Sequence, residues 1–153
     1  MSGIAMQPSE FQDEPSPLEP PCITGDPAAQ ADAALDMAQA RWRAGDLSAA
    51  TRYIELALGT LERAGLRHRL GEAYKLHAMA FISRDKASLA LAAASRALGY
   101  PDVGAKDRMY LYATVAMALH QLVDLRVGGQ VMLEQSWPEA QRAGDAKTLV
   151  DCA

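Results

Sequence analysis

The chain has 153 residues, a formal net charge of −4 and an apolar fraction of 50%, and aromatic residues make up only 6% of it. Its apolar residues are rich in Ala, Leu and Met, which are good helix formers, and no stretch offers the alternating Val, Ile, Thr and aromatic residues of a strand. These values predict an all-α protein with one compact domain or a short repeat array, and they exclude the basic character of a nucleic-acid binder.

Residues 1–27 differ in composition from the rest of the chain. They hold six of the eight prolines and five acidic residues, but no Lys or Arg. Such a segment buries too little apolar surface to offset its ordering entropy, so we expect a disordered acidic leader. A short docking peptide, or a strap laid over the helices, is the functional alternative.

Several signals point to a soluble, cytoplasmic protein. The N-terminus lacks the basic and apolar regions of a signal peptide, and no apolar run approaches the ~18 residues of a membrane span. Cys22 and Cys152 are too far apart in sequence to make a disulfide framework or a zinc motif, which fits a reducing compartment.

The first predicted hairpin covers residues 28–64. Asp26-Pro27 combines an N-cap residue with a proline at the first helical position, so a helix should begin there. Ala44-Gly45-Asp46 should end that helix and cap the next one, because Gly tolerates positive φ and Asp is a good N-cap. The second helix should end near Ala64-Gly65.

The second predicted hairpin covers residues 66–98, with a short break at Arg84-Asp85. Its second helix, residues 86–98, is almost purely small and apolar. Because Ala contributes little area per residue, such a helix is stable only when neighbours enclose it closely.

The third predicted hairpin covers residues 105–142. Gly128-Gly129 should weaken its second helix by about 1 kcal/mol per glycine, and Trp137-Pro138 should end or kink it. Ala143-Gly144-Asp145 repeats the earlier break, so residues 145–153 should open a further, partial helix.

The first hairpin resembles the tetratricopeptide repeat family over residues 31–64. The resemblance rests on Ala38 at the small position of the first helix, on Gly45-Asp46 at the turn, and on small and apolar positions along the second helix. The Ala-Leu pairs that begin at Ala57 and Ala97 lie 40 residues apart, against a family period of ~34, so linkers should be longer here. The resemblance implies that residues 28–153 form a short right-handed solenoid of about three antiparallel hairpins plus the partial helix.

The same resemblance implies a binding groove lined by the first helix of each hairpin. The groove-facing residues would mix charged, amide, aromatic and thioether groups, as peptide-binding grooves tend to do. They are Asp32, Gln39, Arg43, Lys75, Met79, Tyr110, Met117, His120 and Gln121. An ordinary solvated face is the alternative, and the family's carboxylate clamp is not expected because only Lys75 and Arg43 come near it.

The sequence contains no pattern that predicts catalysis, a cofactor or a metal. It lacks a Gly-rich phosphate loop, H-E-x-x-H and G-x-S-x-G. His68, His77 and His120 are not at ligand spacing; His68 should lie at an exposed corner, and the other two should be partly packed or face the groove. We therefore expect a protein without enzymatic activity.

These features together favour a module that binds a protein or peptide, with no nucleic-acid or membrane partner. The residues after Ala143 are similar to junctions that precede output domains, so we expect the N-terminal sensory or oligomerising region of a larger bacterial signalling regulator, such as a diguanylate cyclase. The alternative is a free-standing three-repeat adaptor or secretion chaperone. Apolar residues near the end, Leu149, Val150 and Trp137, also predict a homodimer through the C-terminal hairpin.

Overall fold

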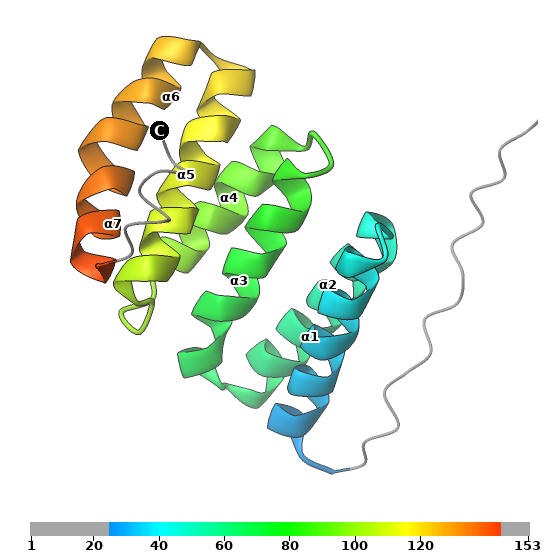
Figure 1. The fold of residues 1–153 in the computed structure, drawn as a ribbon. Helices are drawn as coiled ribbons and strands as arrows, with labels where there is room; N and C mark the ends of the chain where they lie inside the picture. The colour runs from blue at the N-terminus through cyan, green and yellow to red at the C-terminus, as the bar shows by residue number, and fades with distance from the viewer. Residues whose placement is uncertain (1–24, 145–153) are drawn as a thin grey trace, which may run out of the picture.

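The computed structural model of the protein describes residues 25–144, and in this part of the chain short turns connect helices and no strand is present (Figure 1). The expected all-α class is therefore confirmed. The elements in chain order are α1 (Pro27–Arg43), α2 (Leu47–Ala64), α3 (Arg67–Ile82), α4 (Ala87–Leu98), α5 (Ala105–Leu122), α6 (Leu125–Val131), the π-helical turn η1 (Met132–Ser136) and α7 (Trp137–Ala143). The predicted leader, except for its last three residues, and the predicted partial helix at 145–153 lie outside the described residues, as do both cysteines.

The first helices begin and end at the residues that the sequence predicts. The Asp26 carboxylate accepts a hydrogen bond of 3.0 Å from the Ala28 amide, and Pro27 is the first helical residue. Gly45 takes a φ of 82° in the turn, and Asp46 caps α2 by accepting a 2.9 Å bond from Ala49. Asp caps remove unsatisfied amide donors from the helix start, and each is worth about 1 kcal/mol.

Consecutive helices pack against one another along the chain. Helix α1 packs on α2, α2 on α3, α3 on α4 and α4 on α5, and α3 also contacts α5 directly. Figure 1 shows the α1–α2 pair at one end of the molecule and α6 with α7 at the other, so α3 and α4 occupy the middle. Within residues 25–144, no helix is both long and apolar enough to span a bilayer.

Helix α4 is enclosed between α3 and α5, as its composition predicts. Its alanines at positions 90, 94 and 97 are completely inaccessible to solvent. Neither end of this helix is stabilised by a side-chain cap: the N-cap residue is Lys86, which makes no side-chain cap bond. The stability of α4 therefore comes from its neighbours and from close approach of their backbones.

Of the two outcomes expected at Trp137-Pro138, an end or a kink of the helix, the end is wrong. The chain instead continues as a helix to Ala143, and the turn before Pro138 widens into η1. A proline ring clashes with the carbonyl four residues earlier and cannot donate to it, and a wider π turn relieves both problems without ending the helix. The helix then ends at Gly144, which has a φ of 65°.

Gly128 brings α6 close to α5. A Cβ atom at this position would lie 2.5 Å from the backbone oxygen of Ala116, whereas the neighbouring Gly129 has open space around it. Gly128 is also buried. The two adjacent glycines therefore differ: only Gly128 is required by the packing.

Candidate functional site

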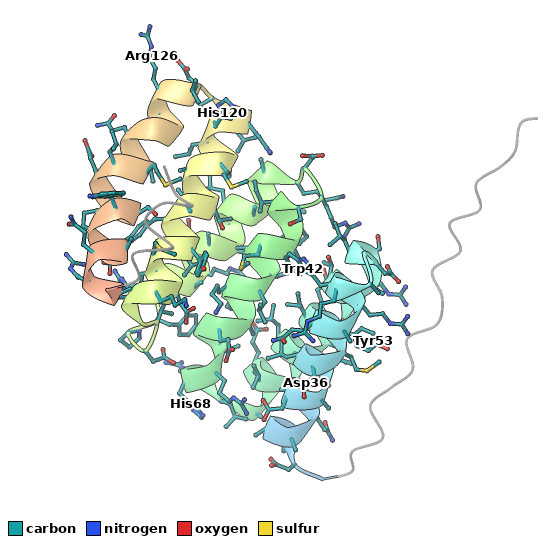
Figure 2. The ribbon with its side chains drawn as sticks, in the orientation of Figure 1. Asp36, Trp42, Tyr53, His68, His120 and Arg126 are labelled. Atoms are coloured by element: carbon teal, nitrogen blue, oxygen red, sulfur yellow. The ribbon has the colours of Figure 1, made fainter. Side chains whose placement is uncertain are left out.

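A groove separates α1 from α3. It encloses about 170 Å³ and is lined by Ala38, Gln39, Trp42 and Arg43 of α1, Ile54 of α2, and Leu76 and Met79 of α3. Trp42 lies on the side of α1 that faces this groove (Figure 2). Its indole ring, Leu76 and Met79 make an apolar wall, while Gln39 and Arg43 are exposed at the rim.

Three of the nine residues predicted to face a groove meet here: Gln39, Arg43 and Met79. Two others are engaged in ion pairs between helices. Arg69 of α3 forms a bidentate pair with Asp32 of α1, and Lys75 of α3 pairs with Asp107 of α5 at 2.7 Å. Both pairs tie successive first helices together.

The remaining four predicted residues lie on α5, away from this groove. Met117 and His120 line a hollow of about 220 Å³ under α6, and His120 is seen near the α6 end of α5 in Figure 2. Gln121 lines a recess beside the start of α4, and Tyr110 is exposed. The nine residues thus do not share one continuous recess.

A second and larger cavity, of about 400 Å³, lies among α2, α3 and α4. Each helix contributes residues at the spacing i, i+3, i+7, which places them on one helical face. They are Glu55, Leu58 and Glu62 of α2; Tyr74, His77 and Phe81 of α3; and Leu89, Ala92 and Arg96 of α4, together with Gly59 and Ala93.

A chain of polar contacts crosses one side of this cavity. The hydroxyl of Tyr74 donates a 2.5 Å hydrogen bond to Glu62 and accepts one of 3.1 Å from Arg96. The Arg96 guanidinium also lies 5.6 Å from the centre of the Tyr74 ring. Burial, and then the bond to Glu62, raise the pKa of Tyr74, so the hydroxyl keeps its proton and acts as the donor.

His77 lies on the other side of the cavity. Its Nε2 atom is buried and has no hydrogen-bond partner among residues 25–144, and the Oε1 atom of Glu55 lies 3.5 Å away. The imidazole packs against Phe81, with ring centres 4.2 Å apart. Burial lowers the pKa of His77 despite the opposing effect of Glu55, so the ring is neutral at pH 7.

Sequence reasoning did not predict this cavity. It placed no function on Glu55, Glu62 or Arg96. The shared i, i+3, i+7 spacing on three successive helices is a signal that could have drawn attention to these faces. Which faces converge, however, depends on the rotation of each helix about its axis, and that is set by packing.

His68 is exposed at the start of α3, as predicted (Figure 2). Across residues 25–144, no three His, Cys, Asp or Glu side chains come together in a way that could hold a metal ion. The described residues therefore form an all-helical protein whose helices pack in chain order, with an apolar groove between α1 and α3 and a mixed cavity among α2, α3 and α4. Protein-family models, curated proteins and solved structures were all compared with the chain, and none of them matches it.

Proposed function

We propose that the chain is a protein–protein interaction module whose helices form a short tetratricopeptide-like stack of hairpins. In this proposal the groove between α1 and α3 holds a peptide segment of a partner protein. The observation that carries it is the composition of that groove: an apolar wall of Trp42, Leu76 and Met79 beneath the exposed polar groups of Gln39 and Arg43. Peptide-binding sites commonly combine aromatic and Met side chains with a few polar groups that fix orientation.

The lining indicates which peptides fit. A cavity of about 170 Å³ accommodates one bulky apolar side chain rather than a folded surface. The guanidinium of Arg43 favours a carboxylate next to that side chain, and the Gln39 amide can both donate to and accept from a peptide backbone. The preferred segment is therefore extended, with a large apolar residue beside an acidic one.

The ion pairs of Asp32 and Lys75 have a different role in this proposal. Because these side chains already pair with α3 and α5, they brace the first helices against one another. The spacing between α1 and α3, and with it the width of the groove, depends on such braces. Specificity then rests mainly on Gln39, Arg43 and Met79.

The chain contains two tryptophans, so the groove can be given its own fluorescent reporter. In a Trp137→Phe background, Trp42 is the sole tryptophan. Peptides selected from a random display library against this protein should shift the Trp42 emission on binding. The Met79→Lys substitution should weaken their binding at least about tenfold, because it places a charge in the apolar wall.

The control is Met117→Lys on α5, since Met117 is exposed and outside the groove. It should leave both peptide affinity and the Trp42 response unchanged. Selected peptides that bind equally well to the Met79→Lys protein, or that leave the Trp42 emission unchanged, would refute the proposed site.

A second proposal is self-association through the C-terminal hairpin, formed by α5, α6, η1 and α7. Large apolar side chains are exposed on these elements: Met117, Leu122, Val123, Leu125, Val127, Leu133 and Trp137. Exposed apolar residues gathered on one part of a protein commonly mark an interface, and a second copy of the chain would cover them symmetrically.

Leu133 offers a clean test because it is 72% exposed and so contributes little to the fold of one chain. Sedimentation at high micromolar concentration should give a dimer for the native protein and a monomer for Leu133→Glu. Leu56→Glu on α2, another exposed leucine, should remain dimeric. A monomeric native protein would refute self-association. Whether the module belongs to a larger signalling regulator or stands alone as an adaptor or chaperone stays a prediction from the sequence.

A further inference from the structure

The cavity among α2, α3 and α4 has the size and lining of a small-molecule site. Its volume of about 400 Å³ falls within the range of about 300–1,000 Å³ that ligand pockets occupy. It lies on a different side of α3 from the peptide groove, and the two share no lining residue. A ligand here would therefore occupy a separate site from that of the peptide proposed above.

Small residues create the space, and larger ones give it apolar walls. Gly59, Ala92 and Ala93 leave room between α2 and α4, while Phe81 and Leu89 provide apolar surface. The ring of Phe81 is positioned by its contact with His77. A compact apolar or aromatic body can pack against these groups without displacing a polar contact.

The charges in the cavity do not balance. Arg96 and Glu62 are linked through the Tyr74 hydroxyl, so one positive and one negative group are committed to each other. Glu55 has a different neighbour, the Nε2 atom of His77 at 3.5 Å, and that ring is neutral because burial lowers the pKa of His77. Among the side chains that line the cavity, the carboxylate of Glu55 is therefore left without a cationic partner, and at 53% exposure it lies at the open edge of the cavity, where a charged ligand can reach it.

We propose that this cavity binds a small organic cation, a compact amine with an aromatic body. The ammonium group donates to the carboxylate of Glu55, and the aromatic body packs on Phe81 and Leu89. An ammonium supplies the positive charge that the cavity lacks, and an aromatic ring fits the apolar wall with favourable ring contacts.

Three probes of similar size test whether the cavity requires a positive charge on its ligand: 2-phenylethylamine, 2-phenylethanol and phenylacetate. They carry the same ring with a cationic, a neutral and an anionic end. Isothermal titration calorimetry on the full chain should give a dissociation constant of about 1 mM or below for the amine. The alcohol should bind at least about tenfold more weakly, and phenylacetate should not bind measurably.

Three substitutions test the location. Glu55→Gln removes the charge and keeps the shape, so it should weaken amine binding by roughly two- to fivefold, the range expected for an exposed ion pair. Ala92→Leu fills the cavity without changing charge and should abolish binding of the amine. Glu72→Gln changes an exposed carboxylate on α3 that does not line the cavity, so its affinity should match the native protein.

Circular dichroism establishes that each variant is folded before its affinity is read. The inference is overturned if the amine does not bind, if the alcohol binds as tightly as the amine, or if Glu55→Gln leaves the affinity unchanged. Because neither Trp42 nor Met79 lines this cavity, the Trp42 assay can fail while amine binding persists, and the two proposals fail separately.

Discussion

Replacing each of the two adjacent glycines of α6 by alanine should affect stability differently, with Gly128→Ala the less stable variant. Both substitutions gain about 1 kcal/mol of helix propensity, because Gly is the poorer helix former. At Gly128, however, the new Cβ would lie 2.5 Å from the Ala116 oxygen, where ordinary contact begins at 3.4 Å. Helices α5 and α6 would have to separate by roughly 0.9 Å, and overpacking of this kind costs about 1–3 kcal/mol. Gly129 has open space, so its substitution carries no such cost.

The difference between the two variants isolates the steric contribution, since the propensity gain is common to both. Gly129→Ala should be more stable than the native protein, and Gly128→Ala should be less stable than Gly129→Ala by about 1–3 kcal/mol. For a domain of this size each kcal/mol moves Tm by about 4 °C, so thermal unfolding followed at 222 nm resolves the pair. Urea titration provides the free energies directly. Equal stability of the two variants would refute the close approach of α6 to α5.

Three further predictions concern local features of the fold. Asp46→Ala should lower the free energy of unfolding by about 1 kcal/mol, because it removes the α2 cap. Lys86→Ala, at the uncapped start of α4, should change the free energy of unfolding by less than about 0.5 kcal/mol. Equal effects of the two substitutions in a urea titration would contradict the role of the cap. Gly104→Ser should stabilise the protein by a few tenths of a kcal/mol up to about 1 kcal/mol. The reason is that Gly104 is the N-cap residue of α5, with an extended backbone, free space at the Cβ position and no side-chain cap. A lower Tm for this variant would contradict the prediction. Burial lowers the pKa of His77 in the folded protein, so its contribution to stability is complete above the unfolded pKa of about 6.5 and is lost as pH falls toward the folded value. The stability advantage of the native protein over His77→Gln in urea titrations should therefore shrink between pH 7 and 5, and an advantage that stays constant over this range would contradict the burial of the ring.

The helix boundaries were predictable because they depend on a few neighbouring residues. Asp26, Asp46 and Gly65 act through their own backbone geometry or a single nearby amide, so a sequence pattern reveals them. The π turn before Pro138 was not predictable as such: proline predicts a disturbance, but whether the helix ends or widens depends on the packing of α7 against α5. Tertiary contacts decided the outcome there.

The candidate sites were predictable only in part. Gln39, Arg43 and Met79 meet at one groove, as predicted. Their shared location depends only on helix periodicity and on the adjacency of α1 and α3, which the sequence indicates. The partners of Asp32 and Lys75 lie 37 and 32 residues away in sequence, and pairing over such distances depends on how hairpins dock. To predict the cavity around His77, one would need to know how three helices dock at once.

Helix α3 forms a wall of both recesses. Leu76 and Met79 face the peptide groove, while Tyr74, His77 and Phe81 face the cavity on its other side. A ligand that favours one position of this helix in either recess changes the affinity of the other recess, and thermodynamic linkage makes the two effects equal in size. Because the two recesses share this wall, their affinities are linked to the extent that either ligand shifts α3.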